Sequence, residues 1–129
     1  MFTNGDYNVN GGTTVLPSIN PFEFEEEVFS GSDVLLTCHV PRGDQPLTIW
    51  WTLNGVRLTT NATTSVTMFN TKTSVLTLTG VDHYSNGEYR CIAENSAGLT
   101  SHSANLTVYG KNTAIVKRHW NHKYPLRVS

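Results

Sequence analysis

"SNGEYRCIAENSAG", residues 85–98, places a tyrosine, a cysteine and a glycine turn within one short run. Neighbouring side chains on a strand point to opposite faces, so Tyr89, Cys91 and Asn95 share one face. The charged residues between them lie on the other face, which meets water or a partner. A strand with a cysteine on its inward face indicates a second cysteine across a core.

The rest of the chain also reads as short strands. Aliphatic, threonine and aromatic residues come in brief runs separated by Gly, Pro, Asn and Ser, without a sustained helical period. About eight strands with turns every few residues predict an all-β chain folded as a two-sheet sandwich. The expected strands are 19–31, 33–40, 47–53, 56–58, 65–70, 74–81, 87–95 and 99–109. We expect the first of these to be an edge strand, because Pro21 cannot donate to a ladder.

The two cysteines set the register of the sandwich. Cys38 lies on an early strand, Trp51 follows it by thirteen residues, and Tyr89 precedes Cys91 by two. In a sandwich these positions converge at the centre. We therefore expect a Cys38–Cys91 bridge between the sheets, Trp51 packed against it, and the Tyr89 hydroxyl bonded to the backbone as a tyrosine corner. Leu36 and Leu78 are expected in the same core.

Charge and composition exclude several functions. The net charge of -1 divides into four Lys/Arg against ten Asp/Glu in residues 1–110 and five Lys/Arg without acids in residues 111–129. An acidic body argues against nucleic acid as a partner. We find no nucleophile motif, phosphate loop or supported carboxylate pair, and expect no enzyme, cofactor or small-molecule substrate. His119 and His122 are more often solvated than metal-bound at this spacing, so we expect no metal site.

The cellular setting is indicated by cysteines and glycosylation sequons. One cysteine pair and two Asn-x-Thr sequons, at Asn61 and Asn105, favour an extracellular protein carrying glycans at those asparagines. The chain lacks a signal peptide and an apolar run long enough to cross a bilayer. Either it is cytosolic or it is a piece of something larger.

Four motifs read together resemble a known family: "INPFEF", "GDQPLTIWWTLNG", "TSVLTLTGV" and "GEYRCIAENSAG". They resemble the immunoglobulin superfamily, and "LTLTGVDHYSNGEYRCIAENSAG" is similar to its I-set. More narrowly, they are similar to the variable Ig domains of arthropod Down syndrome cell adhesion molecules (Dscam). The resemblance implies an I-set domain over residues 19–109. We expect disorder in residues 1–18 and in the basic tail 110–129, and hypothesise that both ends are flanking sequence translated through splice junctions.

The resemblance also implies a binding surface. Identical Dscam-like variable domains pair antiparallel through the sheet made by the first, second, fourth and fifth strands, which serves self-recognition in neurons or immune cells. The contact residues expected here are Leu35, Thr37, His39, Phe69, Val75 and Thr77. The opposite sheet would expose Trp50, Thr52, Arg90, Ile92 and Asn105, where a glycan would crowd docking and an arginine could cover Trp50.

The main hypothesis is therefore an extracellular, non-enzymatic module of a larger adhesion receptor that binds an identical domain. Two alternatives stay open. One is a heterophilic module of an immune or growth-factor receptor, which shares the fold and differs in partner. The other is a cytosolic I-set spacer of a muscle scaffold with reduced thiols, which a glycan at Asn61 or a formed bridge would exclude.

Overall fold

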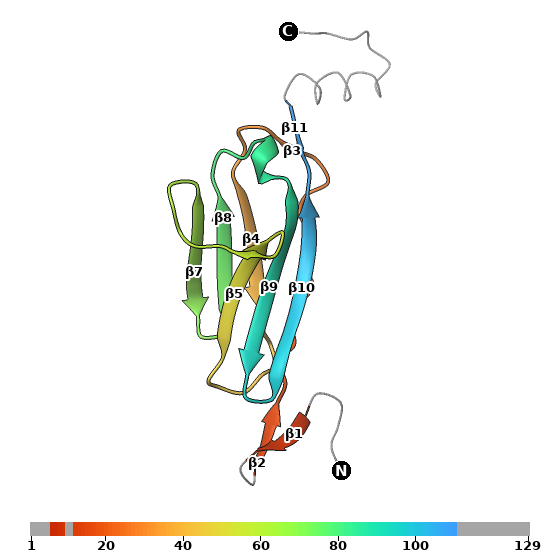
Figure 1. The fold of residues 1–129 in the computed structure, drawn as a ribbon, viewed down its shortest axis with the longest axis vertical. Coiled ribbons are helices and arrows are strands. Elements are labelled where there is room, and N and C mark those ends of the chain that lie inside the picture. Colours follow the sequence, from red (N-terminus) through yellow and green to blue (C-terminus); the bar gives the residue numbers. More distant parts are fainter. Residues whose placement is uncertain (1–5, 10–11, 111–129) are drawn as a thin grey trace.

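The computed structural model describes residues 6–9 and 12–110, with side chains from residue 14 onward, and Figure 1 shows their arrangement. His119, His122 and all but the first residue of the basic tail lie outside the described residues. The strands are β1 (Asp6–Val9), β2 (Gly12–Val15), β3 (Val28–Phe29), β4 (Val34–His39), β5 (Thr48–Leu53), β6 (Val56–Arg57), β7 (Thr64–Asn70), β8 (Thr73–Leu78), β9 (Gly87–Asn95), β10 (Gly98–Leu106) and β11 (Val108–Tyr109). A 3-10 turn, η1 (His83–Ser85), precedes β9.

The strands form two antiparallel sheets that face each other, as expected for a sandwich. One sheet has the order β10-β9-β5-β6 and the other the order β4-β8-β7. The short strands β3 and β11 pair in parallel at the end that also carries η1, and β1 and β2 lie at the opposite end (Figure 1). The fold is therefore an all-β sandwich whose two layers enclose one core.

The predicted disulfide bridge, Cys38–Cys91, is confirmed and joins β4 to β9 across the core. Trp51 pairs with Cys91 in the strand register and has no exposed surface. Its indole Nε1 donates a hydrogen bond to the hydroxyl of Ser74, also fully buried, at 2.9 Å. A buried indole N–H usually finds such an acceptor. Leu36 and Leu78 belong to the same buried cluster.

Tyr89 forms the corner expected from its position. Its hydroxyl donates to the carbonyl oxygen of Ser85 at 2.7 Å, which joins β9 to the preceding 3-10 turn. Burial raises the pKa of Tyr89 to about 12, because a phenolate in the core would lose its hydration. Asp82 caps the turn by accepting from the backbone N–H of Tyr84. Tyr89 therefore also anchors the 3-10 turn that precedes its own strand.

The structure differs from the expected first strand. Residues 19–27 belong to no strand, although the backbone N–H of Asn20 donates to the carbonyl of His39 on β4. The chain then continues to β3, which pairs with β11 in a separate two-stranded sheet. Pro21 has no N–H for a continuous ladder, so the pairing that Asn20 makes with β4 does not extend past it.

The N-terminal segment makes contacts that the sequence does not indicate. Residues 6–9 and 12–15 pair as an antiparallel hairpin. The backbone N–H of Ser18 donates to the carbonyl of Arg42 at 2.8 Å. The Ser18–Arg42 bond joins residues far apart in the chain, so no local apolar pattern predicts it. Contacts with the sandwich therefore begin before Ile19.

Candidate protein-binding face

The outer side of the β4-β8-β7 sheet carries most of the contact residues expected from the sequence. We call this side, formed by the outward residues of those three strands, the BED face, because β4, β8 and β7 correspond to the strands lettered B, E and D in sandwiches of this kind. Antiparallel pairing places Leu35 opposite Thr77, Thr37 opposite Val75, and His39 opposite Thr73. Alternation along β4 produces this arrangement, since Leu36 and Cys38 are buried while Leu35 and Thr37 are exposed.

An open groove of about 420 Å³ runs over this face. Its lining residues are Leu35, Thr37, His39, Phe69, Thr73 and Val75. Thr77, which the sequence analysis grouped with them, lies further along β8 and does not line the groove. Thr73 was missed because residues 70–73 were interpreted as a polar turn, although alternation from Val75 would have placed it on the same face.

Phe69 projects from the edge of this groove. Its side chain is 76% exposed, and that of Leu35 is 61% exposed. The register between β7 and β8 shifts between Met68 and Asn70, so Phe69 has no partner in the ladder. Bulges of this kind turn a side chain away from the regular pleat. The irregularity therefore leaves a large apolar ring in solvent beside an apolar hollow.

The polar groups at one end of the groove are already paired with each other. His39 Nδ1 and Thr73 Oγ1 lie 2.8 Å apart, and Thr73 is 7% exposed. Among the described residues that line the groove, none carries a carboxylate, ammonium or guanidinium group. Covering the groove would therefore bury apolar surface without stranding an unpaired charge.

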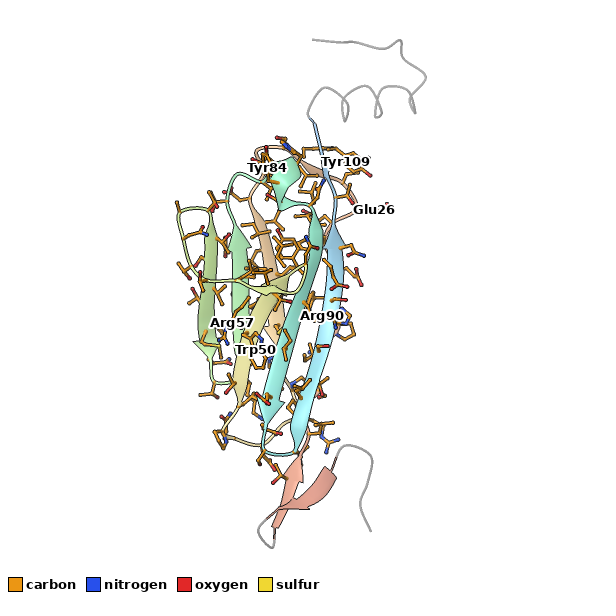
Figure 2. All side chains as sticks on the ribbon, in the orientation of Figure 1. Glu26, Trp50, Arg57, Tyr84, Arg90 and Tyr109 are labelled. Atoms are coloured by element: carbon orange, nitrogen blue, oxygen red, sulfur yellow. A yellow bond between two sulfur atoms is a disulfide. The ribbon has the colours of Figure 1, made fainter. Side chains whose placement is uncertain are left out.

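The outer side of the β10-β9-β5-β6 sheet is different in character. The guanidinium of Arg57 lies over the ring of Trp50 at 5.4 Å, as Figure 2 shows for the labelled pair. Alternation along β9 predicts that Ile92 is exposed, but Ile92 is only 8% exposed because it lies between Trp50 and Ser101 of the two neighbouring strands. Arg90 donates to Ser101 at 2.9 Å. Ile92 is therefore covered on this sheet, whereas Leu99 on β10 and Val56 on β6 stay exposed.

Comparison with known proteins assigns the family. The sequence model of the immunoglobulin domain matches residues 17–95. The chain belongs to the immunoglobulin domain family. It is 36% identical over 101 residues to cell adhesion molecule Dscam2 of Drosophila melanogaster, covering 77% of this chain and 5% of that protein. The domain thus spans a small part of the length of such relatives.

Solved structures show the same fold. The Dscam1 Ig7 domain, isoform 5, superposes with a TM-score of 0.69 at 37% identity, covering 71% of this chain and 95% of that one. The I-band fragment I67-I69 from titin superposes with a TM-score of 0.63 at 26% identity, covering 73% of this chain and 32% of that one. The resemblance to Dscam noted in the sequence is therefore confirmed.

The two sequon asparagines of this immunoglobulin domain lie away from the groove. Asn61 is exposed just before β7, and its Oδ1 accepts hydrogen bonds from the backbone N–H groups of Thr63 and Thr64, each at 2.9 Å. From Thr64, Phe69 lies five residues along β7, a distance of about 17 Å. Asn105 is exposed on β10 of the other sheet. Glycans at these positions would leave the groove open.

Across the described part of the chain, no helix is long and apolar enough to cross a membrane.

Proposed function

We propose that this immunoglobulin domain is an extracellular, non-enzymatic binding module of a larger adhesion receptor, and that its BED face binds an identical domain. The observation that carries the proposal is the open apolar groove with Phe69 projecting beside it. The relatives are named cell adhesion molecules, which supports a role in contact between cells. The formed disulfide suits an oxidising compartment.

A projecting group beside a hollow suits pairing between identical copies. A two-fold axis uses the same patch twice, so Phe69 of one copy can enter the groove of the other while the reverse contact forms at the same time. Fully burying a phenylalanine contributes up to about 3 kcal/mol, and the symmetric interface includes the contribution twice. The same symmetry makes a single charge on the face costly, since it enters both halves of the contact.

The opposite sheet is a poorer candidate for this contact. Arg57 covers Trp50, Ile92 is buried, and Asn105 carries a sequon on the neighbouring strand. A glycan there would have to be excluded from any docked partner. Arg90 already bonds to Ser101 and Glu88, so a partner docked over this part of the sheet would have to cover a charged group.

Sedimentation equilibrium of the full chain tests the proposal. Wild-type protein should self-associate, and Phe69→Asp should weaken association at least about 100-fold, equivalent to about 2.7 kcal/mol. Leu99→Asp is the matched control, because Leu99 is a 57% exposed apolar residue on the opposite sheet. Association that survives Phe69→Asp but is lost in Leu99→Asp or Trp50→Asp would place the contact on the other face.

Self-association and thiol state also separate this proposal from the alternatives. A chain that stays monomeric at every workable concentration would favour a heterophilic receptor module. The likeness to titin I67-I69 supports the other alternative, a cytosolic spacer. Free thiols at Cys38 and Cys91 in protein isolated under native conditions would favour the spacer, whereas a glycan at Asn61 or a bridge in that protein would exclude it.

A further inference from the structure

Residues 14–18, which we call the entry segment, lie against one end of the sandwich. This end is formed by the turn between β4 and β5 and by the β9–β10 hairpin. The backbone N–H of Val15 donates to Asp44 Oδ2 at 2.8 Å, and the backbone N–H of Asp44 donates back to the carbonyl of Val15 at 3.2 Å. Asp44 therefore bonds Val15 with both its side chain and its backbone.

Asn95 adds a second set of hydrogen bonds that holds Val15. Its side-chain amide Nδ2 donates to the carbonyl of Val15 at 2.6 Å and to the carbonyl of Asp44 at 3.1 Å. Its Oδ1 accepts from the backbone N–H of Ala97 at 2.9 Å, so its own hairpin holds the amide in place. A single half-buried side chain thus connects the entry segment to both loops.

The remainder of the entry segment is held by further bonds and by close packing. The hydroxyl of Thr100 donates to the carbonyl of Pro17 at 2.7 Å, and Ser18 bonds to Arg42. Gly43 adopts φ +146°, and a Cβ built on it would lie 3.0 Å from the Cα of Pro17. Only glycine takes this backbone conformation without strain and leaves room for the segment.

These contacts differ from those of a flexible linker, whose backbone bonds to water and whose direction is free. We propose that Asp44 and Asn95 form a clamp that fixes the direction in which the chain enters the domain. In a longer receptor, the clamp would hold the domain before this one in a defined orientation. The inference goes beyond the proposed function, because it concerns the orientation of neighbouring domains and requires no self-association.

Backbone ¹⁵N relaxation of the full, isotope-labelled chain tests the clamp. In the wild type, the amides of Val15, Leu16 and Ser18 should have order parameters near 0.85, as in a rigid strand. In Asn95→Ala these values should fall below about 0.6 while β4 and β9 stay unchanged. Asn70→Ala is the matched control, because Asn70 accepts from Lys72 within its own turn.

Two variants separate the clamp from a general loss of structure. Asn95→Asp keeps an oxygen for the N–H of Ala97 but has no amide to donate, so it should release the entry segment with the hairpin intact. Asp44→Ala should speed hydrogen exchange of the Val15 amide at least about tenfold. Asp33→Ala is its control, since Asp33 accepts from Gly80 elsewhere in the fold.

Residual dipolar couplings then test the direction of the segment. One alignment tensor should describe the backbone N–H groups of Thr14, Val15, Leu16 and Ser18 together with the sandwich in the wild type, and should fail for Asn95→Ala. Wild-type order parameters below about 0.6 in the entry segment, or an Asn95→Asp protein whose segment stays as rigid as wild type, would overturn the clamp. Sedimentation results for Phe69→Asp are independent of these measurements, so failure of one proposal does not imply failure of the other.

Discussion

The hydrogen bond between Trp51 and Ser74 leads to a sharp prediction about stability. Ser74→Ala removes the acceptor of the buried indole N–H and leaves a donor in the core without its partner. An unpaired buried donor costs about 1–3 kcal/mol, whereas a substitution of an exposed serine usually costs within about 0.5 kcal/mol. Because a domain is stable by only about 5–15 kcal/mol, we expect a loss near 2 kcal/mol to be large.

Urea unfolding followed by circular dichroism, with the disulfide intact, measures this loss. Ser74→Ala should lower the midpoint without changing the slope, and should lower the melting temperature by about 8–16 °C. Ser65→Ala is the matched control, since Ser65 lies on the neighbouring strand β7, half exposed, and contacts the Thr67 hydroxyl at 3.3 Å. We expect that control to stay near the wild type.

A double-mutant cycle with Trp51→Phe isolates the bond itself. Phenylalanine keeps an aromatic ring at the centre of the core but has no N–H, so Ser74→Ala should cost less in that background. The coupling free energy should be at least about 0.5 kcal/mol. Additive losses, or a Ser74→Ala variant as stable as Ser65→Ala, would refute the idea that this bond stabilises the core.

Two further predictions concern the bridge and the tyrosine corner. Replacing Cys38 and Cys91 by alanine should lower the free energy of unfolding by about 4 kcal/mol, because the bridge closes a loop with a sequence separation of 53. Denaturant titration measures this loss. A much smaller loss would mean that the unfolded chain keeps these segments together without the bridge. Tyr89 keeps its proton in the fold up to about pH 12 but loses it near pH 10 when unfolded, so the unfolded state binds fewer protons between these values and stability falls as pH rises. The fall should reach about 2 kcal/mol by pH 12, and Tyr89→Phe should reduce it in pH-dependent thermal melts.

At the candidate binding face, strand alternation predicts the direction of some side chains and not of others. Alternation placed Leu35, Thr37, His39 and Val75 on one face, and the structure brings them together at the groove. It could not show that a register shift leaves Phe69 projecting, because a bulge depends on how two strands pair and not on the residues of one.

Alternation also does not predict which side chains are covered by residues of other strands. Ile92 occupies an outward position on β9, yet Trp50 and its neighbours cover it. Periodicity gives the direction of a side chain relative to its own strand. Whether another residue then lies over it depends on the size and conformation of side chains from distant parts of the chain.

From the sequence alone, the cysteines, the central tryptophan and the tyrosine near the second cysteine determine a two-layer β fold, since strand periodicity and one covalent link leave few other arrangements. The tertiary structure alone decided the acceptor for the indole N–H, the shape of the groove and the fastening of the entry segment. The entry segment is held by Asp44 and Asn95, the indole N–H by Ser74, and the groove is lined by residues of β4, β7 and β8; in each case the residues are far apart in the chain. Their meeting is a property of the packed layers, because no short-range pattern encodes the distance between them.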